Sequence, residues 1–211
     1  MNQTARYLTL VFTLFALTVM SHAQDLSLEG RSGLQINLGF WGGATTSNSL
    51  SISGVRSEAK TSGFAGGLLF KHWMQENLSV TLSAGLLGMQ GSTAIGPSGL
   101  DIHASDAIPV LLGVQYYLPS PGPGDAIRPF LSAAVGPIIG FEAKVTGISQ
   151  SAVTETTFGG RVGGGIDFFM GPHVALTADM GYNLMADFDT SIGSKKNFNG
   201  AQFSLGLGYI F

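Results

Sequence analysis

Apolar and polar residues alternate along most of the chain beyond residue 33. Near the end, for example, Phe203, Leu205, Leu207, Tyr209 and Phe211 are separated by single residues, mostly Ser or Gly. Such a period of two places alternate side chains on opposite faces of a β-strand. We therefore predict strands with one apolar face. Eight runs show this pattern: residues 33–43, 62–73, 78–88, 106–118, 128–139, 156–169, 174–184 and 199–211.

The connections between these runs alternate in length. Short links rich in Pro, Gly or Asn lie at 74–77, 119–126 and 170–173, and long links rich in Ser, Thr, Asn and Gly lie at 44–61, 91–105, 140–155 and 186–198. Short turns on one side and long loops on the other are the layout of outer-membrane barrels. Most runs are also close to the 9–11 residues that a tilted strand needs to cross a bilayer. We expect the four long links outside the cell and both termini on the periplasmic side.

A sheet inside a membrane has to be closed. Every backbone N–H and C=O in hydrocarbon needs a partner within the protein, and an open sheet leaves two unpaired edges. The fold class that we predict is all-β: an eight-stranded antiparallel up-and-down transmembrane β-barrel. The first run, Leu34 to Phe40, then pairs with the last, and the apolar side chains face lipid. Aromatic residues near strand ends predict two girdles: Phe40, Trp41, Phe64, Phe70, Trp73, Tyr116, Tyr117, Phe168, Phe169, Tyr182, Tyr209 and Phe211.

The first 23 residues have a different character. An apolar run from Tyr7 to Met20 follows a short basic start, and Ser21-His22-Ala23 supplies small residues at the positions that a signal peptidase reads. We predict a secretory signal peptide over residues 1–23, cleavage before Gln24, and a barrel domain over 24–211. An uncleaved membrane anchor is the alternative, but the run is shorter than the roughly 20 residues that a spanning helix needs.

Composition supports this interpretation. Charged residues make up only 11% of the 211 residues, against about 25% in ordinary soluble domains. The net charge of -3 gives no electrostatic reason to expect a nucleic-acid partner. The chain has no Cys, which excludes disulfides, thiol catalysis and Cys-ligated metals. We expect no cofactor.

Several segments resemble the eight-stranded bacterial outer-membrane β-barrel family, the porin-like proteins of the OmpA-barrel and OmpX type. They are residues 67–70, 108–117, 128–130, 158–169 and the closing Phe-Ser-Leu-Gly-Leu-Gly-Tyr-Ile-Phe. The resemblance implies an integral outer-membrane location, contact with lipid and lipopolysaccharide, and recognition of the last strand by the barrel-assembly machinery. The assembly signal would be Phe203, Leu205, Leu207, Tyr209 and Phe211. The family includes adhesins, stability elements, small pores and a few enzymes, so it predicts fold better than activity.

Four charged residues fall on the inward face of the predicted strands: Lys71, Arg161, Asp167 and Asp179. Charges in a membrane-embedded barrel are costly unless they are paired. Lys71 and Asp167 would meet across the lumen, and Arg161 would meet Asp179 on the neighbouring strand. We interpret the cluster as salt bridges that fill the narrow interior. A gated polar path is the alternative.

Other candidate sites carry weaker signals. His103 and Ser105 resemble the His-x-Ser pair of lipid A deacylase barrels, but Asp106 replaces the usual Asn and both side chains would point inward. Residues 187–193 resemble the start of a calcium loop, but Phe198 stands where Glu is required. We interpret that segment as a polar exterior loop in which Lys195 and Lys196 would meet lipid phosphates. The glycines from 159 to 165 precede a strand rather than a helix, so they do not fit a phosphate-binding loop.

The sequence therefore predicts a non-enzymatic outer-membrane barrel that presents its loops for adhesion, envelope stability or surface interaction. A narrow pore or conduit for small molecules is one alternative. A secreted binder of the lipocalin type is another, since Gly39-Phe40-Trp41 resembles the Gly-x-Trp of lipocalins. That alternative requires the apolar face to point inward.

Overall fold

The computed structural model describes residues 27–44, 50–52, 55–57, 61–96, 99–120, 126–146, 149–193 and 195–211. The predicted signal peptide and its cleavage site lie outside these residues. No described residue belongs to a helix long and apolar enough to cross a bilayer. The strands of the described part are β1 Ser32–Ala44, β2 Leu50–Ile52, β3 Val55–Ser57, β4 Thr61–Gln75, β5 Leu78–Gly96, β6 Gly99–Tyr117, β7 Ile127–Thr146, β8 Ser149–Phe169, β9 Val174–Met185 and β10 Gly200–Ile210.

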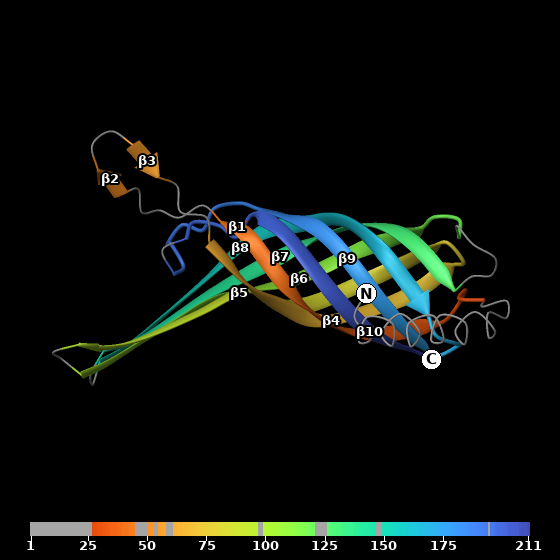
Figure 1. Cartoon of the computed structure of the whole chain (residues 1–211), viewed down its shortest axis with the longest axis horizontal. Helices are drawn as coiled ribbons and strands as arrows, with labels where there is room; N and C mark the ends of the chain where they lie inside the picture. Colours follow the sequence, from red (N-terminus) through yellow and green to blue (C-terminus); the bar gives the residue numbers. More distant parts are fainter. Residues whose placement is uncertain are drawn as a thin grey trace, which may run out of the picture.

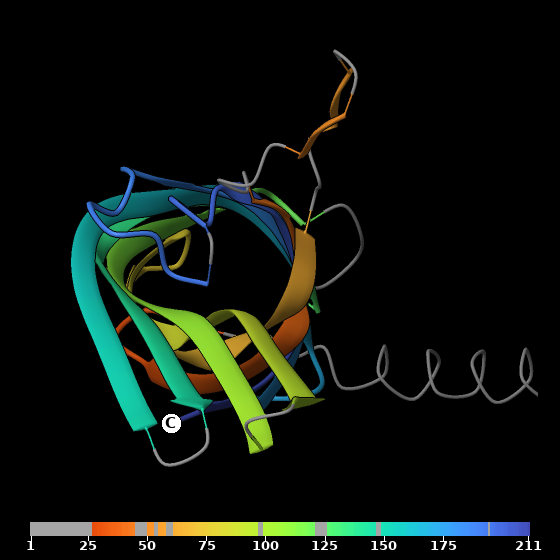
Figure 2. The ribbon, with the colours of Figure 1, turned by 90° about the vertical axis from the view of Figure 1, so that its left-hand side faces the viewer.

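Eight strands form one closed antiparallel barrel in the order β1-β10-β9-β8-β7-β6-β5-β4 (Figures 1 and 2). The closing seam joins β1 to β10, with Leu34 opposite Tyr209 and Phe40 opposite Phe203. This confirms the predicted fold class and the predicted pairing of the first run with the last. Strands β2 and β3 form a separate hairpin in the link between β1 and β4. Ser32 and Phe211 are hydrogen-bonded to each other at one end, which we call the terminal end; the opposite end is the mouth.

The apolar face of the strands points outward. Leu205, Leu207 and Tyr209 are each more than half exposed, while Ser204 between the outward positions of β10 is buried. The same alternation surrounds the barrel, so large hydrophobic side chains cover its outer wall. A soluble protein rarely exposes so large an apolar surface. The lipocalin alternative is therefore wrong, because it needs the apolar side chains inside.

Four strands are longer than the sequence pattern predicts. Pairing of β5 with β6 continues to Gly96↔Gly99, and pairing of β7 with β8 continues to Thr146↔Ser149. Our prediction of long loops at 91–105 and 140–155 is wrong, because β-strands run through both segments. The many Ser and Gly residues in these segments suggested loops. The Ile, Val and Thr residues between them favour paired strands. In Figure 1 the four extended strands project well beyond the barrel wall.

The predicted aromatic girdles need a correction as well. Trp41, Trp73, Tyr117 and Phe169 point into the barrel and are at most 3% exposed. Three of them directly follow an aromatic neighbour that points outward, and consecutive residues of a strand must face opposite sides. A pair such as Phe168-Phe169 therefore places one ring on the outer wall and one in the lumen. The remaining residues of the predicted girdles do point outward: Phe40, Phe64, Phe70, Tyr116, Phe168, Tyr182, Tyr209 and Phe211.

Candidate functional site: the lumen and its two closures

A buried ion pair crosses the lumen near the terminal end. Lys71 Nζ from β4 lies 2.9 Å from Asp167 Oδ2 of β8, and both side chains are at most 4% exposed. Tyr117 donates its hydroxyl to the same oxygen at 2.7 Å, and Thr177 donates to Oδ1 at 2.6 Å. A buried charge is tolerated only when it is paired and hydrogen-bonded. The network supplies both conditions and links β4, β6, β8 and β9.

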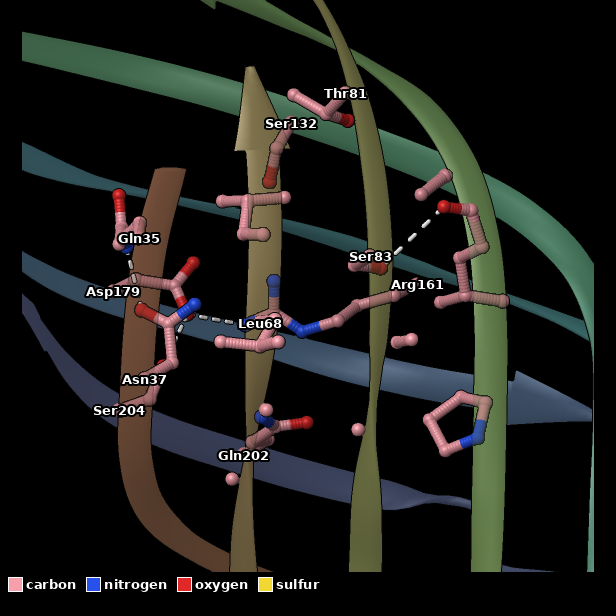
Figure 3. A pocket seen from close by; sticks show the side chains of 18 of the residues that line it. Gln35, Asn37, Leu68, Thr81, Ser83, Ser132, Arg161, Asp179, Gln202 and Ser204 are labelled. Atoms are coloured by element: carbon pink, nitrogen blue, oxygen red, sulfur yellow. Dashed lines mark hydrogen bonds and ion pairs between the residues drawn. The ribbon is translucent and has the colours of Figure 1, made fainter. Parts of the chain in front are cut away.

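A second ion pair lies closer to the mouth. Arg161 Nη2 of β8 donates to Asp179 Oδ1 of β9 at 2.5 Å, and Ser204 of β10 donates to the same oxygen at 2.8 Å (Figure 3). The structure thus brings the four predicted lumen charges together as two separate pairs. The cause is the two-residue alternation, which turns all four side chains inward.

Hydrophobic side chains close the lumen below the first pair. Leu28, which precedes β1, is fully buried against the inward rings of this end. We call this cluster the floor; its members are Leu28, Trp73, Tyr117, Phe130, Phe169, Ala175 and Ile210. The sequence pattern gave no sign of Leu28, because a residue outside the strands has no alternating neighbours that assign it to a face.

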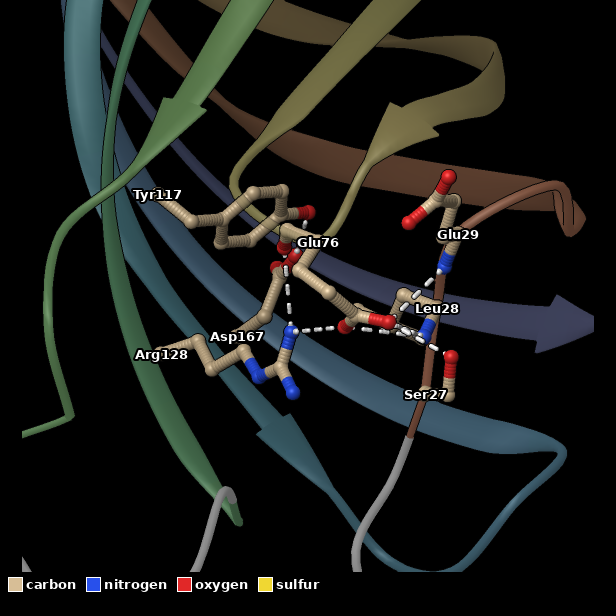
Figure 4. Close-up of polar contacts among 7 residues, drawn as sticks. All are labelled: Ser27, Leu28, Glu29, Glu76, Tyr117, Arg128 and Asp167. Atoms are coloured by element: carbon tan, nitrogen blue, oxygen red, sulfur yellow. Dashed lines mark hydrogen bonds and ion pairs between the residues drawn. The ribbon is translucent and has the colours of Figure 1, made fainter.

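Glu76 holds the segment that carries Leu28 (Figure 4). Its carboxylate in the β4–β5 turn accepts hydrogen bonds from Ser27 Oγ at 2.5 Å and from the backbone N–H groups of Leu28 and Glu29 at 3.1 and 3.3 Å. Arg128 Nη1 lies 3.6 Å from Glu76 Oε2. Partial burial acts to raise the pKa of Glu76, but these hydrogen bonds and the Arg128 charge outweigh it, so the pKa lies below its ordinary value.

We expect Glu76→Gln to weaken the attachment of the segment that carries Leu28 to the β4–β5 turn. A carboxylate that is stabilised in the folded state contributes stability above its ordinary pKa and loses it as the pH falls through the lowered value. In the native chain, protection of the Leu28 amide hydrogen, corrected for the intrinsic effect of pH on exchange, should therefore fall only in acid, below about pH 4.5. In the variant its exchange should be several-fold faster already at pH 7. Equal protection of this amide in both proteins at pH 7 would show that Glu76 does not hold the segment.

The opposite end is closed by the mouth segment, which we define as residues 186–199 with residue 194 outside the description. Phe188, Ile192 and Phe198 of this segment are at most 4% exposed and pack in one cluster with Trp41 and Ile138 of the barrel wall. Our interpretation of residues 187–193 as a polar exterior loop is therefore wrong. Tertiary packing turns the few apolar residues of the segment into the barrel.

Two wall glycines leave room for this packing. Gly88 has a φ of +84° at the point where the pairing register of β5 shifts, and a Cβ there would lie 2.9 Å from the Phe198 ring. A Cβ on Gly140 would lie 2.8 Å from Ile192 and 2.9 Å from Phe188. A side chain at either position would therefore force these side chains of the mouth segment to shift.

Hydrogen bonds fix the mouth segment to several wall strands, among them β1, β7 and β8. The Trp41 indole N–H donates to the Phe198 carbonyl at 3.0 Å. The backbone N–H of Gly193 donates to Glu142 of β7 at 2.8 Å, and that of Thr190 donates to Glu155 of β8 at 3.0 Å. The segment is thus bonded to β1, β7 and β8 as well as packed.

Lys195 is a charged residue of the mouth segment, and it is buried. It is 1% exposed, and its Nζ has no hydrogen-bond partner among the described residues. The ammonium lies 5.1 Å from the Trp41 ring centre and 4.9 Å from that of Phe198. Burial lowers its pKa to about 8, and the nearby Asp106 charge offsets part of that effect. Lys195 therefore cannot meet lipid phosphates as predicted; only Lys196 is exposed.

A polar cavity of about 120 Å³ lies between the two closures (Figure 3). Amide and hydroxyl side chains share its lining with the Arg161–Asp179 pair, with Lys71 of the other pair and with apolar side chains. Six of the uncharged polar lining residues are Gln35, Asn37, Ser83, Gln115, Ser132 and Gln202. The lumen therefore contains a polar chamber between two apolar closures. The floor lies at the terminal end, and the apolar residues of the mouth segment lie at the mouth.

The closed barrel, its apolar outer wall and its polar lumen agree with one family. A family model described as the outer membrane protein beta-barrel domain matches residues 10–211. The chain belongs to this family. Membership makes it an integral outer-membrane β-barrel protein, so the apolar wall faces lipid.

Solved structures of other outer-membrane barrels share this fold. Neisserial surface protein A superimposes with a TM-score of 0.53 at 16% identity, covering 87% of this chain and 98% of its own. Ail of Yersinia pestis, in complex with the heparin analogue sucrose octasulfate, gives 0.52 at 16% identity and covers 87% and 99%. OprG of Pseudomonas aeruginosa gives 0.51 at 14% identity and covers 89% and 99%. No curated protein matches the sequence.

The candidate catalytic and metal sites of this outer-membrane barrel find little support. Ser105 is buried, and a Cβ on Gly193 would overlap its hydroxyl, so the mouth segment covers it. The His103 side chain lies outside the described residues. Within the described ranges no three His, Asp or Glu side chains are grouped to hold a metal ion. The glycines from 159 to 165 lie within β8.

Proposed function

We propose that this outer-membrane barrel is a non-enzymatic surface protein that presents a rigid four-stranded sheet to molecules outside the cell. One observation carries the proposal: β5, β6, β7 and β8 continue as paired strands beyond the barrel wall (Figure 2). Binding residues are often found on segments that a rigid scaffold holds in place. We place both termini in the periplasm and the extended sheet outside, as in other bacterial barrels with long extracellular connections.

The extended sheet has two open edges. Among the described residues, β4 stops pairing with the outer side of β5 at Met89, and β9 pairs with the outer side of β8 only from Gly159 onward. An unpaired edge offers a row of backbone N–H and C=O groups to which an extended peptide can add as a further strand. The kind of partner that fits this surface is therefore a polypeptide with an extended segment.

Charge argues against a sulfated polysaccharide as the partner. The structure of Ail contains a heparin analogue, but this shows a ligand of Ail and not of the present chain. Across residues 90–105 and 141–156 this chain has three carboxylates, Asp101, Glu142 and Glu155, against one lysine, Lys144. The net charge of these two segments is therefore negative, which opposes binding of sulfate groups.

A shortened variant tests the proposal. Residues 92–103 and 144–151 are each replaced by Asn-Gly, which joins the paired positions Gly91 with Ala104 and Ala143 with Ala152 through two-residue hairpin turns. We expect the variant to assemble normally, with the heat-dependent gel mobility of the full chain. Cells that carry it should adhere at least about tenfold less to immobilised fibronectin, laminin and collagen.

Two controls make this result interpretable. Protease treatment of intact cells should cleave the full chain within the extended sheet or the β1–β4 link, and the variant only in the latter. Soluble sucrose octasulfate should not reduce adhesion, since the sheet is acidic. Equal adhesion by cells with the full and the shortened chain would refute the surface function.

The last strand supports a further part of the proposal. Phe203, Leu205, Leu207, Tyr209 and Phe211 all point outward and are 46–60% exposed. They form a continuous apolar stripe at the end of the chain, which is the feature that we assign to recognition by the barrel-assembly machinery. Lipid and lipopolysaccharide would surround the same stripe after insertion.

A narrow conduit is the second candidate, and the polar chamber is the observation that favours it. Because apolar layers close both ends of that chamber, such a conduit would not be a permanently open pore. Planar-bilayer recordings of the native chain should show no steady conductance at any voltage.

A further inference from the structure

The polar chamber contains side-chain atoms whose hydrogen bonding is incomplete. Gln115 Oε1, Ser132 Oγ and Arg161 Nε are buried and have no partner among the described residues. Gln115 lies on β6, Ser132 on β7 and Arg161 on β8, and all three line the same cavity. Gln115 is only 3% exposed. A buried polar atom without a partner costs about 1–3 kcal/mol. A molecule that satisfied all three atoms would recover much of that cost.

We propose that the chamber is a binding site for one small, uncharged, hydrogen-bonding solute of the size of urea or glycerol. The proposal is independent of the surface function, because it concerns the lumen and not the extended sheet. The unpartnered atoms define the chemistry: an amide oxygen accepts, a guanidinium N–H donates, and a hydroxyl does either. The ligand therefore needs both donors and acceptors.

Charge in the chamber favours an uncharged ligand. Each cationic side chain of the lining is already paired, Lys71 with Asp167 and Arg161 with Asp179. An ion would therefore lose its hydration without gaining a free counter-charge, which is costly in a buried site. A neutral amide or polyol exchanges its hydrogen bonds with water for hydrogen bonds with Gln115, Ser132 and Arg161.

Size sets the upper limit. The cavity measures about 120 Å³, and one ordered water needs only about 10–15 Å³ of such space. The chamber therefore has room for several waters or for one solute of a few non-hydrogen atoms. Because the floor and the mouth segment cover the two ends of the lumen, we expect them to exclude larger solutes, and we expect entry to follow transient opening of the mouth segment.

Side-chain NMR of the full barrel in lipid nanodiscs tests the proposal. The probes are urea and glycerol, each titrated to 100 mM, and acetate and guanidinium serve as charged comparisons. We expect saturable shifts of the Arg161 Nε–H and Gln115 amide signals with the neutral probes only. Gln115→Met keeps the size of the side chain but removes its polar atoms, and should weaken binding about tenfold, the effect of one lost hydrogen bond.

Ser132→Ala should also weaken binding, which provides a second variant if Gln115→Met folds poorly. Ser79→Ala is the matched control. Its hydroxyl is likewise buried on β5 without a partner, but Ser79 does not line the cavity, so binding should not change. Water cross-peaks without any saturable shift would show that the chamber holds water only and would overturn the proposal. Unchanged binding in both Gln115→Met and Ser132→Ala would overturn it as well.

Discussion

Replacing Asp167 by Asn should lower the free energy of unfolding of the barrel by about 3–5 kcal/mol, the usual effect of breaking a buried ion pair from one side. The substitution keeps the shape of the side chain and removes its charge. Lys71, itself only 3% exposed, then keeps a positive charge in the lumen without a counter-charge. Tyr117 and Thr177 also lose the carboxylate that accepts their hydrogen bonds.

Urea titration in lipid vesicles, followed by the gel mobility of the folded barrel, measures this loss. Asp189→Asn is the control, because Asp189 is exposed in the mouth segment, and it should change stability by less than about 0.5 kcal/mol. The double variant Lys71→Met with Asp167→Leu should recover most of the loss, since no charge is then left unpaired. If Asp167→Asn unfolds at the same urea concentration as the native chain, the network does not stabilise the barrel.

Replacing Lys195 by Met should strengthen closure of the mouth at neutral pH. The lysine pKa is about 8 in the closed state and 10.5 when the side chain is in water, and this difference corresponds to roughly 3 kcal/mol. Cation–π contacts with Trp41 and Phe198 offset part of that cost. We expect a net gain of about 1–3 kcal/mol for closure, because methionine fits among the rings without a charge to desolvate.

The dependence on pH follows from the sign of the shift. The closed state favours neutral Lys195, so opening takes up a proton between pH 8 and 10.5. Closure of the native mouth should therefore be strongest above pH 10.5, weaken as the pH falls to 8, and then level off. The charged group that acts on Lys195 is Asp106 of β6. Glu142 of β7 and Glu155 of β8 bond to the same mouth segment, which also carries Asp187, Asp189 and Lys196.

Hydrogen exchange of the Ile192 and Gly193 amides, corrected for the intrinsic effect of pH, measures closure. The Gly193 N–H donates to Glu142 of the wall, and the Ile192 N–H donates to the Lys195 carbonyl within the packed segment. Lys195→Met should slow their exchange roughly 10- to 100-fold at pH 7 and abolish the change between pH 8 and 10.5. Lys196→Met is the matched control, since that lysine is exposed, and it should have no effect. Faster exchange in Lys195→Met would mean that the charge stabilises the closed mouth.

The sequence by itself determined the wall of the barrel. Alternation is a local property, so it assigns each strand residue to lipid or lumen without knowledge of the rest of the chain. That is why Leu34 and Tyr209 were expected on opposite sides of one seam, and why Lys71, Asp167, Arg161 and Asp179 were all expected inside. The strand count follows from the same pattern and from the need for closure in hydrocarbon.

Only the tertiary structure decided what fills the lumen and how far the sheet extends. Trp41 and Phe198 form one lid although 157 positions separate them, and Leu28 closes the floor against a turn that is 48 residues away. The extra length of β5–β8 depends on their pairing with each other and not on the lipid boundary. Lys195 follows no strand pattern at all. Its burial results from the packing of the mouth segment on distant residues, which a periodicity of two cannot encode.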